Sequence, residues 1–261
     1  MNTLMQLMVD AARKAGDEIE MIYGAGCATE IKEDGSPVTE ADHRAEAIIL
    51  AALGAAYPDI PVIAEEEACA GRIPEIGERF FLVDPLDGTR GFVNRTGEFT
   101  VNIALIENCI ATAGVIYVPD SHRLYYGEAG EGAFRRVDDG ETQPIRARAG
   151  PAEGLKVLAS RTTAEKTAAM LAHLNIAEFL PSSSSLKFCL LAEGSADVYP
   201  RYGRTMEWDT AAGQAILEAA GGRVMALDGS VETGPLRYGK TKGGFENPPF
   251  IAWGATAGET G

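Results

Sequence analysis

Apolar residues recur every three or four positions near the start of the chain, which is the spacing of a helix with one buried face. Residues 3–23 follow this pattern, with apolar side chains at Leu4, Leu7, Met8, Ala11, Ala12, Ala15, Ile19 and Ile22. Gly24 and Gly26 are expected to end that helix. A second helix is predicted over residues 39–57, just before Pro58, and the polar segment 30–38 between the two is predicted to be a loop.

Short apolar runs of the kind that forms β-strands follow the second helix. They occupy residues 61–64, 80–83, 99–106, 111–118 and 124–127. Turn residues, Glu107-Asn108 and Pro119-Asp120, separate neighbouring runs. These strands are therefore predicted to be antiparallel neighbours.

The pattern changes at residues 138–154, which are rich in glycine, proline and charge and have no apolar period. We place a boundary there, between an N-terminal α+β half, residues 1–148, and a C-terminal α/β half, residues 149–261. In the second half, predicted strands at 155–159, 176–180 and 197–199 alternate with predicted helices at 162–174, 186–193 and 208–220. Such alternation is typical of layered α/β folds.

The charge balance excludes one class of partner. The 261 residues include 23 lysines and arginines against 38 aspartates and glutamates, a net charge of −15 that repels nucleic acid polymers. No apolar stretch approaches the roughly 20 residues of a membrane span, and charges are scattered through the first 24 residues, unlike in a secretion signal. We therefore expect a cytoplasmic protein, with peripheral association with the inner membrane left open.

The cysteines are widely spaced and have no neighbouring histidine: Cys27, Cys69, Cys109 and Cys189. This spacing indicates neither a disulfide framework nor a zinc site. We expect all of them to be buried as small apolar side chains.

The apolar run 80–83 leads directly into two acids and a Gly-Thr step. Asp84 and Asp87 are three residues apart across a turn, so both carboxylates can face one point, while Pro85 is expected to end the strand. Gly88 lets main-chain N–H groups approach an anion. Hard oxygen ligands at a strand end suit Mg²⁺, which recruits substrate phosphate. Ordinary turn chemistry is the alternative.

Other acids stand at similar positions. Glu65, Glu66 and Glu67 follow the predicted strand 61–64, and like charges this close repel one another unless a cation lies nearby. Asp209 falls at a predicted helix start. A solvated acidic loop and a helix cap are the respective alternatives. Metal ions bridged by such acids can activate water and stabilise a leaving oxygen.

Phosphatases of the haloacid dehalogenase type also carry aspartates after an apolar strand, in a D-x-D-G-T motif whose first aspartate is the nucleophile. In this chain Pro85 and Leu86 separate Asp84 from Asp87, so that motif is absent. Water is therefore the expected nucleophile.

The order of the motifs resembles that of the inositol monophosphatase superfamily of Mg²⁺-dependent, lithium-sensitive phosphatases. The matching segments are residues 32–42, 64–66, 84–89 and 208–213, with Gly221-Gly222. Within the superfamily the chain is most similar to the CysQ-type 3′(2′),5′-bisphosphate nucleotidases. That likeness rests on residues 84–92, 184–189, 197–201, 208–213 and 245–250.

The resemblance implies a role for each residue at a matching position. The implied metal ligands are Glu65, Asp84, Asp87, Asp209 and the carbonyl oxygen of Leu86. The substrate contacts implied around the scissile phosphate are Leu86, Asp87, Gly88, Thr89 and Asp209. Thr89 and Asp42 are implied to orient the attacking water beside Glu65, although Thr39 and Asp42 also match a capping box.

Ser184, Lys187 and Arg201 match positions that hold the nucleotide and its second phosphate in this branch. A second phosphate needs cations of its own, so a lysine and an arginine suit the role. Lys32 matches a lysine near the metals. For these basic residues, a solvated surface position is the alternative.

The chain departs from the branch in two places. Residues 160–163, Ser-Arg-Thr-Thr, lack a histidine that contacts substrate in some relatives, and Arg90 and Gly91 follow the D-G-T motif where a lysine and an acid are usual. These changes leave the catalytic residues intact and leave the exact nucleotide preference open.

From the resemblance we expect an α/β fold, a layered α-β-α-β-α sandwich of the sugar-phosphatase type. The expected reaction is hydrolysis of the 3′-phosphate of adenosine 3′,5′-bisphosphate to AMP and phosphate with two or three Mg²⁺ ions, which clears a by-product of sulfate assimilation. The sulfated form, 3′-phosphoadenylyl sulfate, is a second expected substrate. The alternatives are the same chemistry on inositol or another small sugar phosphate, and phosphate binding without catalysis. The oligomeric state stays open.

Overall fold

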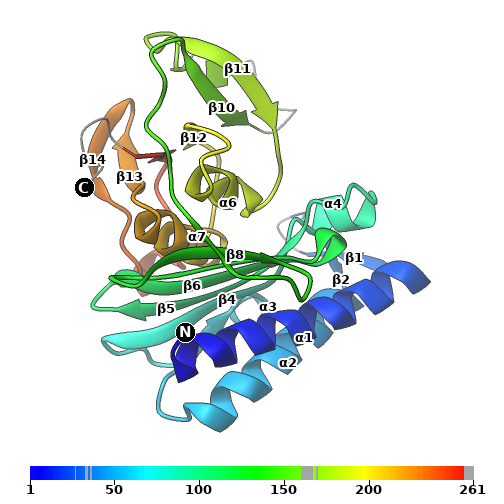
Figure 1. The fold of residues 1–261 in the computed structure, drawn as a ribbon. Helices are drawn as coiled ribbons and strands as arrows, with labels where there is room; N and C mark the ends of the chain where they lie inside the picture. The colour runs from blue at the N-terminus through cyan, green and yellow to red at the C-terminus, as the bar shows by residue number, and fades with distance from the viewer. Residues whose placement is uncertain (27, 33–34, 36, 160–166, 169, 256–261) are drawn as a thin grey trace.

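Two β-sheets, with helices beside and between them, form the structure (Figure 1). It is a computed structural model that describes residues 1–26, 28–32, 35, 37–159, 167–168 and 170–255. The strands of the larger sheet precede residue 146, and those of the smaller sheet follow residue 154. A short hairpin, β1 (Thr29–Ile31) and β2 (Pro37–Thr39), forms a separate pair.

The larger sheet has seven strands in the order β3-β4-β5-β6-β7-β8-β9. Their bounds are β3 (Val62–Ala64), β4 (Arg79–Asp87), β5 (Thr100–Glu107), β6 (Ile110–Val118), β7 (Arg123–Glu128), β8 (Gly132–Val137) and β9 (Gln143–Ile145). Neighbours are antiparallel, as predicted, except that β3 and β4 are parallel. This pair differs because the connection between the two strands, which contains helix α3 (Glu65–Cys69), brings the chain back to the end of the sheet at which β3 begins.

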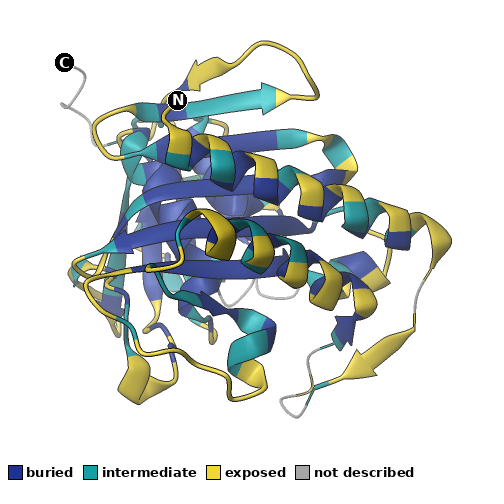
Figure 2. Ribbon diagram, turned by 90° about the horizontal axis from the view of Figure 1, so that it is seen from below, coloured by how far each residue is buried: buried dark blue, intermediate teal, exposed yellow. Residues whose placement is uncertain are grey.

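Helices α1 (Thr3–Ala25) and α2 (Glu40–Ala56) pack side by side on one face of this sheet, as the view from below shows (Figure 2). Both predicted helices are thus confirmed. The Asn2 side chain caps α1 by accepting a hydrogen bond from the Met5 N–H. Thr39 and Asp42 form the predicted capping box at the start of α2. The apolar faces of both helices are buried against the sheet.

The smaller sheet has six strands in the order β11-β10-β12-β15-β13-β14. Their bounds are β10 (Leu155–Ala159), β11 (Ile176–Pro181), β12 (Val198–Arg201), β13 (Arg223–Asp228), β14 (Val231–Pro235) and β15 (Phe250–Trp253). β10 is parallel to β11 and β12, and the remaining pairs are antiparallel. The predicted strands and helices of this half are confirmed, apart from the helix expected at 162–174. Residues 162–166 and 169 of that segment lie outside the described residues, while 167, 168 and 170 are helical and 171–173 form a turn.

Helices α6 (Leu186–Ala192) and α7 (Glu207–Ala219) lie between the two sheets. α7 contacts strands β4 to β8 of the larger sheet and β13 of the smaller one. Gly114 of β6 permits this packing, since a Cβ there would lie 2.4 Å from the carbonyl oxygen of Ala212. The predicted layered α/β sandwich is confirmed.

Two local predictions were wrong. Residues 30–38 do not form a loop throughout, because the β1–β2 hairpin pairs Thr29 with Thr39 across them. Their polar composition concealed the strands. Pro85 does not end β4, which continues to Asp87 with an irregular register between Asp84 and Asp87 that accommodates the missing N–H.

The expectation of buried cysteines holds only in part. Cys189 is buried within α6, but Cys69 and Cys109 are exposed. Cys69 ends the short surface helix α3, and Cys109 lies in the tight turn between β5 and β6, where little of the chain packs over it. Cys27 lies outside the described residues.

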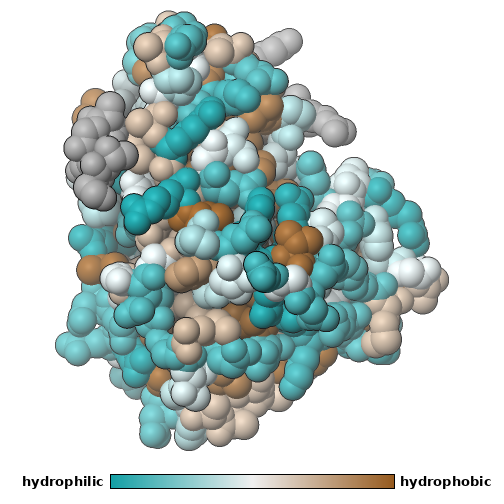
Figure 3. Space-filling view, viewed as in Figure 1, coloured by the Kyte–Doolittle hydropathy of each residue, from teal (hydrophilic) through white to brown (hydrophobic). Residues whose placement is uncertain are grey.

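Polar side chains predominate on the face shown in Figure 3, and apolar ones form small separate patches. The exposed positions of α1 and α2 likewise include charged residues such as Asp10, Lys14 and Arg44. Across the part of the chain that the structure describes, no helix combines the length and apolar character needed to cross a bilayer. The remaining described elements are the short helix α4 (Thr89–Val93) and two 3-10 turns, η1 (Pro119–Ser121) and η2 (Thr241–Gly243).

Candidate active site

The candidate metal ligands stand at the ends of neighbouring elements. β3 and β4 are parallel partners in register, so Glu65 and Asp84, which follow their last paired residues, leave the sheet at the same edge. Glu65 begins α3, and β4 continues through Leu86 to Asp87. Asp209 lies in the first turn of α7, which packs on the same sheet. Topology therefore directs all of the predicted ligands to one end of the larger sheet.

Asp84 is the buried member of this set, while Glu65, Asp87 and Asp209 are partly exposed. Asp84 is 1% exposed, and burial, followed by the charges of Glu65, Asp87 and Asp209, raises the pKa of Asp84 well above its usual value. The Leu86 N–H, which donates to Asp84 Oδ1 at 3.0 Å, acts in the opposite direction. Burial and the charges of Asp87 and Glu65 also raise the pKa of Asp209. The repulsion among these carboxylates would be relieved by a cation placed between them.

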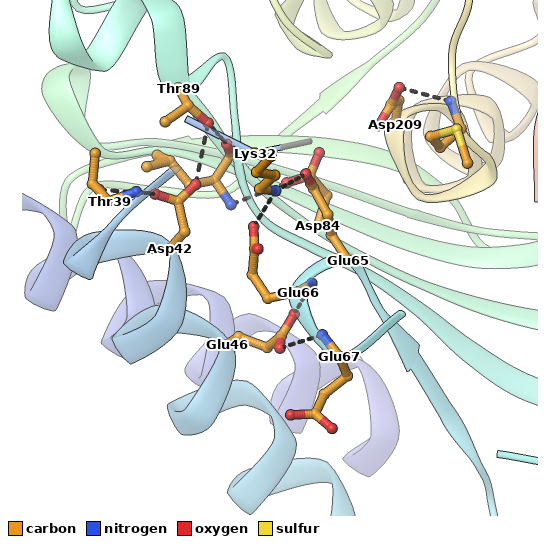
Figure 4. A network of polar contacts seen from close by, with 12 residues as sticks. Lys32, Thr39, Asp42, Glu46, Glu65, Glu66, Glu67, Asp84, Thr89 and Asp209 are labelled. Carbon is orange, nitrogen blue, oxygen red and sulfur yellow. Dashed lines mark hydrogen bonds and ion pairs between the residues drawn. The ribbon is translucent and has the colours of Figure 1, made fainter. Parts of the chain in front are cut away.

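Lys32 supplies one positive charge from the segment next to β1. Its Nζ donates to Glu65 Oε1 at 2.7 Å and to Glu66 Oε1 at 2.6 Å (Figure 4). Burial raises the pKa of Glu65, and Lys32 opposes that rise. The pKa of Lys32 is itself raised, because the two glutamates outweigh the opposing effect of burial. The hairpin thus holds a cation beside the α3 carboxylates.

Asp42 connects the start of α2 to the D-G-T turn. Its Oδ2 accepts hydrogen bonds from the Thr39 N–H at 2.7 Å and the Thr39 hydroxyl at 2.8 Å. Its Oδ1 lies 3.1 Å from Thr89 Oγ1, which is equally close to the Leu86 carbonyl oxygen (Figure 4). A hydroxyl has one proton, so Thr89 donates to one of these acceptors at a time and keeps lone pairs to accept another hydrogen bond.

Ser185 joins Asp87 to the start of α7. Its N–H and hydroxyl lie 2.5 Å and 2.7 Å from Asp87 Oδ2, and its hydroxyl also lies 2.8 Å from the Asp209 carbonyl oxygen. Asn102 of β5 donates to the same hydroxyl at 3.0 Å. The Asp209 side chain caps its own helix, accepting from the Met206 N–H at 2.8 Å. The predicted alternative for Asp209, a helix cap, is therefore present in the structure.

Gly88 forms the sharp turn between β4 and helix α4 (Thr89–Val93). Its φ of 92° lies in the left-handed region, and a Cβ there would lie 2.8 Å from the Glu98 carbonyl oxygen and 3.2 Å from Ser184 Cβ. Only glycine fits both constraints. The turn therefore brings the main chain of the D-G-T motif against Ser184.

Asp87 and Asp209 also line a pocket that contains two cationic side chains, Lys187 and Arg201. Lys187 Nζ donates to the Ser184 carbonyl oxygen at 2.6 Å and lies 5.0 Å from the centre of the Tyr199 ring. Burial lowers the pKa of Lys187 to about 8. The remaining lining residues are Ser184, Ser185, Phe188, Tyr199, Thr205 and Thr210.

Arg201 has hydrogen-bonding capacity to spare. Its Nη2 donates to the Arg204 carbonyl oxygen at 3.2 Å, while its buried Nε has no hydrogen-bond partner within the described part of the chain. A partly dehydrated guanidinium and a buried ammonium in one pocket favour an anionic ligand. The pocket therefore combines cations on one side with the candidate metal ligands on the other.

The donor set suits a hard divalent cation, because it consists of carboxylates and a carbonyl oxygen and lacks positive charge. Within the residues that the structure describes, no three acidic, histidine or cysteine side chains already converge as a ligand set. Glu65 is bonded to Lys32, Asp87 to Ser185, and Asp209 to a main-chain N–H. Figure 4 shows Asp209 apart from Glu65 and Asp84. Metal binding would therefore exchange these hydrogen bonds for metal contacts.

Several residues of this arrangement, Ser185 and Tyr199 among them, were not singled out from the sequence. Ser185 lies in a run of four serines whose composition gives no chemical signal, although its neighbour Ser184 was predicted. Tyr199 lies in a predicted strand, and nothing in the sequence distinguishes it from other strand residues. Residues 33, 34 and 36 of the first motif, and the Ser-Arg-Thr-Thr departure at 160–163, lie outside the described residues.

Comparison with known proteins agrees with this fold and its motifs. The model of the inositol monophosphatase family matches residues 1–257. The chain is 43% identical over 250 residues to the 3′(2′),5′-bisphosphate nucleotidase CysQ of Salmonella typhimurium, covering 95% of this chain and 98% of that protein. The crystal structure of CysQ from Bacteroides thetaiotaomicron is similar with a TM-score of 0.79 at 36% identity, covering 98% of both chains.

An inositol monophosphatase from Anabaena is also similar, with a TM-score of 0.74 at 26% identity, covering 97% of this chain and 91% of that one. Fold and motifs together define a layered α/β phosphatase. The chain belongs to the inositol monophosphatase family, whose members are generally Mg²⁺-dependent.

Proposed function

We propose that this protein is a Mg²⁺-dependent 3′(2′),5′-bisphosphate nucleotidase that hydrolyses the 3′-phosphate of adenosine 3′,5′-bisphosphate to AMP and phosphate. The observation that carries the proposal is the pocket in which Lys187 and Arg201 face the same space as Asp87 and Asp209. A substrate with one phosphate at the carboxylates and another remote from them needs such separate cations. The relatives named as bisphosphate nucleotidases support this assignment.

In this proposal Glu65, Asp84, Asp87, Asp209 and the carbonyl oxygen of Leu86 hold two or three Mg²⁺ ions. When bound, magnesium supplies the Lewis acidity that makes water a nucleophile near neutral pH and offsets charge on the leaving oxygen. The raised pKa values of Asp84 and Asp209 support the ligand assignment, since a cation relieves the repulsion that causes them.

The protein's own residues position the reactants. Thr89 donates a hydrogen bond to Asp42 and accepts one from the attacking water, and Glu65 accepts a hydrogen bond from the other O–H of that water. Main-chain N–H groups of Gly88 and Thr89 bind the reacting phosphate at the start of α4. Ser184, Lys187 and Arg201 hold the nucleotide, with Lys187 and Arg201 on its 5′-phosphate.

A phosphate-release assay with Mg²⁺ over a substrate panel tests this function. The panel contains adenosine 3′,5′-bisphosphate, 3′-phosphoadenylyl sulfate, 3′-AMP and inositol 1-phosphate. We expect the highest kcat/KM for the first, with activity on the sulfated form as well. A clear preference for inositol 1-phosphate would establish the alternative sugar-phosphate activity, and no Mg²⁺-dependent release from any of them would leave phosphate binding without catalysis.

Replacing Lys187 by methionine is expected to affect only substrates that carry a 5′-phosphate. Methionine fits the buried site without a charge. The loss of a charge-assisted hydrogen bond raises the activation free energy for adenosine 3′,5′-bisphosphate by about 1.5–3 kcal/mol, which lowers kcat/KM roughly 10- to 150-fold. Activity on 3′-AMP serves as the control and should change little. Equal losses on both substrates would place Lys187 at the reacting phosphate or in the fold.

Lithium is expected to inhibit the enzyme at millimolar concentration, as it does generally in this family. A small hard cation competes for oxygen ligands of the kind gathered here but carries half the charge of Mg²⁺. Initial rates at several Mg²⁺ concentrations measure this effect, with sodium at equal ionic strength as the control. A rate indifferent to lithium would count against the proposed ligand set.

A further inference from the structure

Glu46 is a buried acid that the proposed chemistry does not use. It lies on α2, is 4% exposed, and follows Asp42 by one helical turn. Its Oε2 accepts a hydrogen bond from the Glu66 N–H at 2.8 Å and its Oε1 accepts one from the Glu67 N–H at 3.0 Å (Figure 4). Both oxygens thus bind successive main-chain amides of α3.

The position is costly for a carboxylate. Among the described residues, no lysine, arginine or histidine lies within ion-pair distance of Glu46. The charge of Arg72 acts on Glu46 only from beyond that distance, while the neighbours of Glu46 include the acids Glu66 and Glu67. Burial raises the pKa of Glu46 to about 7, although the hydrogen bonds from the two amides oppose the rise. A buried charge without a counter-ion does not stabilise a fold by itself. The presence of Glu46 is therefore explained by the main-chain amides that it holds in place.

Those groups are the start of α3. The residue before this helix, Ala64, provides no side-chain cap, and the helix has only five residues, too few to be stable alone. Glu46 therefore caps α3 from another helix. By fixing the second and third residues of α3, it fixes the direction in which the first, Glu65, projects toward the other carboxylates.

The same helix also anchors the second part of the water-orienting arrangement. Asp42 and Glu46 are four residues apart, so they lie on one face of α2. Asp42 contacts Thr89 at the start of α4, while Glu46 holds the start of α3. One rigid helical turn thereby sets the distance between Glu65 and Thr89.

We propose that Glu46 is a positioning residue that fixes Glu65 relative to the Thr89–Asp42 pair by holding the first turn of α3. This inference rests on the proposed function for the roles of Glu65 and Thr89. It assigns Glu46 no contact with substrate or metal.

The substitution Glu46→Gln tests the proposal with little change in shape. The amide oxygen keeps one of the two hydrogen bonds, but the NH₂ group then faces a main-chain donor, and α3 shifts or loosens. Small displacements of a reacting group cost up to about 100-fold in rate, so we expect kcat for adenosine 3′,5′-bisphosphate to fall about tenfold or more. KM should remain within about twofold, since Glu46 is remote from the Lys187 pocket.

Mg²⁺ binding provides a measurement independent of catalysis. Titration calorimetry of the substrate-free protein with MgCl₂ should show a several-fold weaker affinity in Glu46→Gln, because Glu65 is one of the proposed ligands. If that variant does not fold, Glu46→Asp serves instead. It keeps the charge but is one methylene shorter, so it cannot reach both amides and should show the same changes.

Asp197→Asn is the matched control. Asp197 is also a buried acid, 2% exposed, whose side chain accepts a hydrogen bond from a main-chain N–H, that of Lys156, and it pairs with Arg148. It lies at the end of β12 opposite Arg201. The control should lower thermal stability while kcat and Mg²⁺ affinity remain at their wild-type values.

Wild-type kcat and Mg²⁺ affinity in a folded Glu46 variant would overturn the proposal, and so would equal losses in the Asp197 control. Failure of the proposed function is distinguishable from these two outcomes. In that case the wild-type protein itself would release no phosphate from the bisphosphate, while calorimetry would still show whether Glu46 supports Mg²⁺ binding.

Discussion

Asp84→Asn is expected to remove nearly all phosphatase activity and, at the same time, to make the metal-free protein more stable. The activity falls by two or more orders of magnitude because a charged ligand is lost at the point where metal charge stabilises the transition state. The stability rises because an uncharged amide at this buried position no longer repels Glu65, Asp87 and Asp209. The amide oxygen can still accept the Leu86 N–H.

The stability gain has a defined pH dependence. The pKa of Asp84 is higher in the folded than in the unfolded protein, so the folded state binds more protons, and the metal-free wild type loses stability as pH rises above about 4. We therefore expect the variant to be more stable than the wild type at neutral pH in the absence of metal. Its stability should fall less steeply with pH.

Urea unfolding in the presence of a chelator, between pH 5 and pH 8, measures both effects. With Mg²⁺ the order should reverse, because the metal stabilises the wild type more than the variant. A variant that is less stable than the wild type in chelator would show that Asp84 is not held against like charges. Normal turnover at saturating Mg²⁺ would remove it from the ligand set.

Thr89→Ala is expected to lower kcat about 100-fold, equivalent to about 2.7 kcal/mol, with little change in KM. The hydroxyl lies 3.1 Å from Asp42 Oδ1, so its proton is directed at a buried carboxylate and its lone pairs remain for the water. An interaction made mainly in the transition state appears in kcat and not in substrate affinity. Steady-state rates on adenosine 3′,5′-bisphosphate measure the difference.

Thr89→Ser is the control for this prediction, because it keeps the hydroxyl and loses only a methyl group. It should retain most of the activity. If alanine changes KM alone, Thr89 contacts the substrate and does not orient water. If serine is as impaired as alanine, packing at the start of α4 explains the loss.

The helices were predictable because their apolar periods report directly on one buried face. The eight apolar positions of residues 3–23 all belong to α1, and its buried residues follow the same spacing. The short helices α3 and α4 and the strands β1, β2, β8, β9, β13, β14 and β15 were not predicted. β14, for example, is mostly exposed and contains Gly234, so its extended form depends on pairing with β13 and not on its own composition.

The candidate site was predictable where its chemistry is local. Asp84, Leu86, Asp87, Gly88 and Thr89 are consecutive or nearly so, and the strand before them indicates where their side chains begin. The contacts between distant segments were not. Lys32 and Glu65 are 33 residues apart, and Ser185 and Asp87 are 98 apart, so neither hydrogen bond follows from spacing. For Asp209 the sequence offered a metal ligand and a helix cap as alternatives, and the structure was needed to show that the cap is formed.

The close packing of α7 on β6, which Gly114 permits, also bears on how the site is assembled. α7 covers strands β4 to β8, so a growing chain that has not yet reached residue 219 leaves that face of its larger sheet open to water. The same helix delivers Asp209. Covering of that face and arrival of the last acidic candidate ligand are therefore a single step. During synthesis the carboxylates of the candidate catalytic centre come together only when α7 closes over the larger sheet.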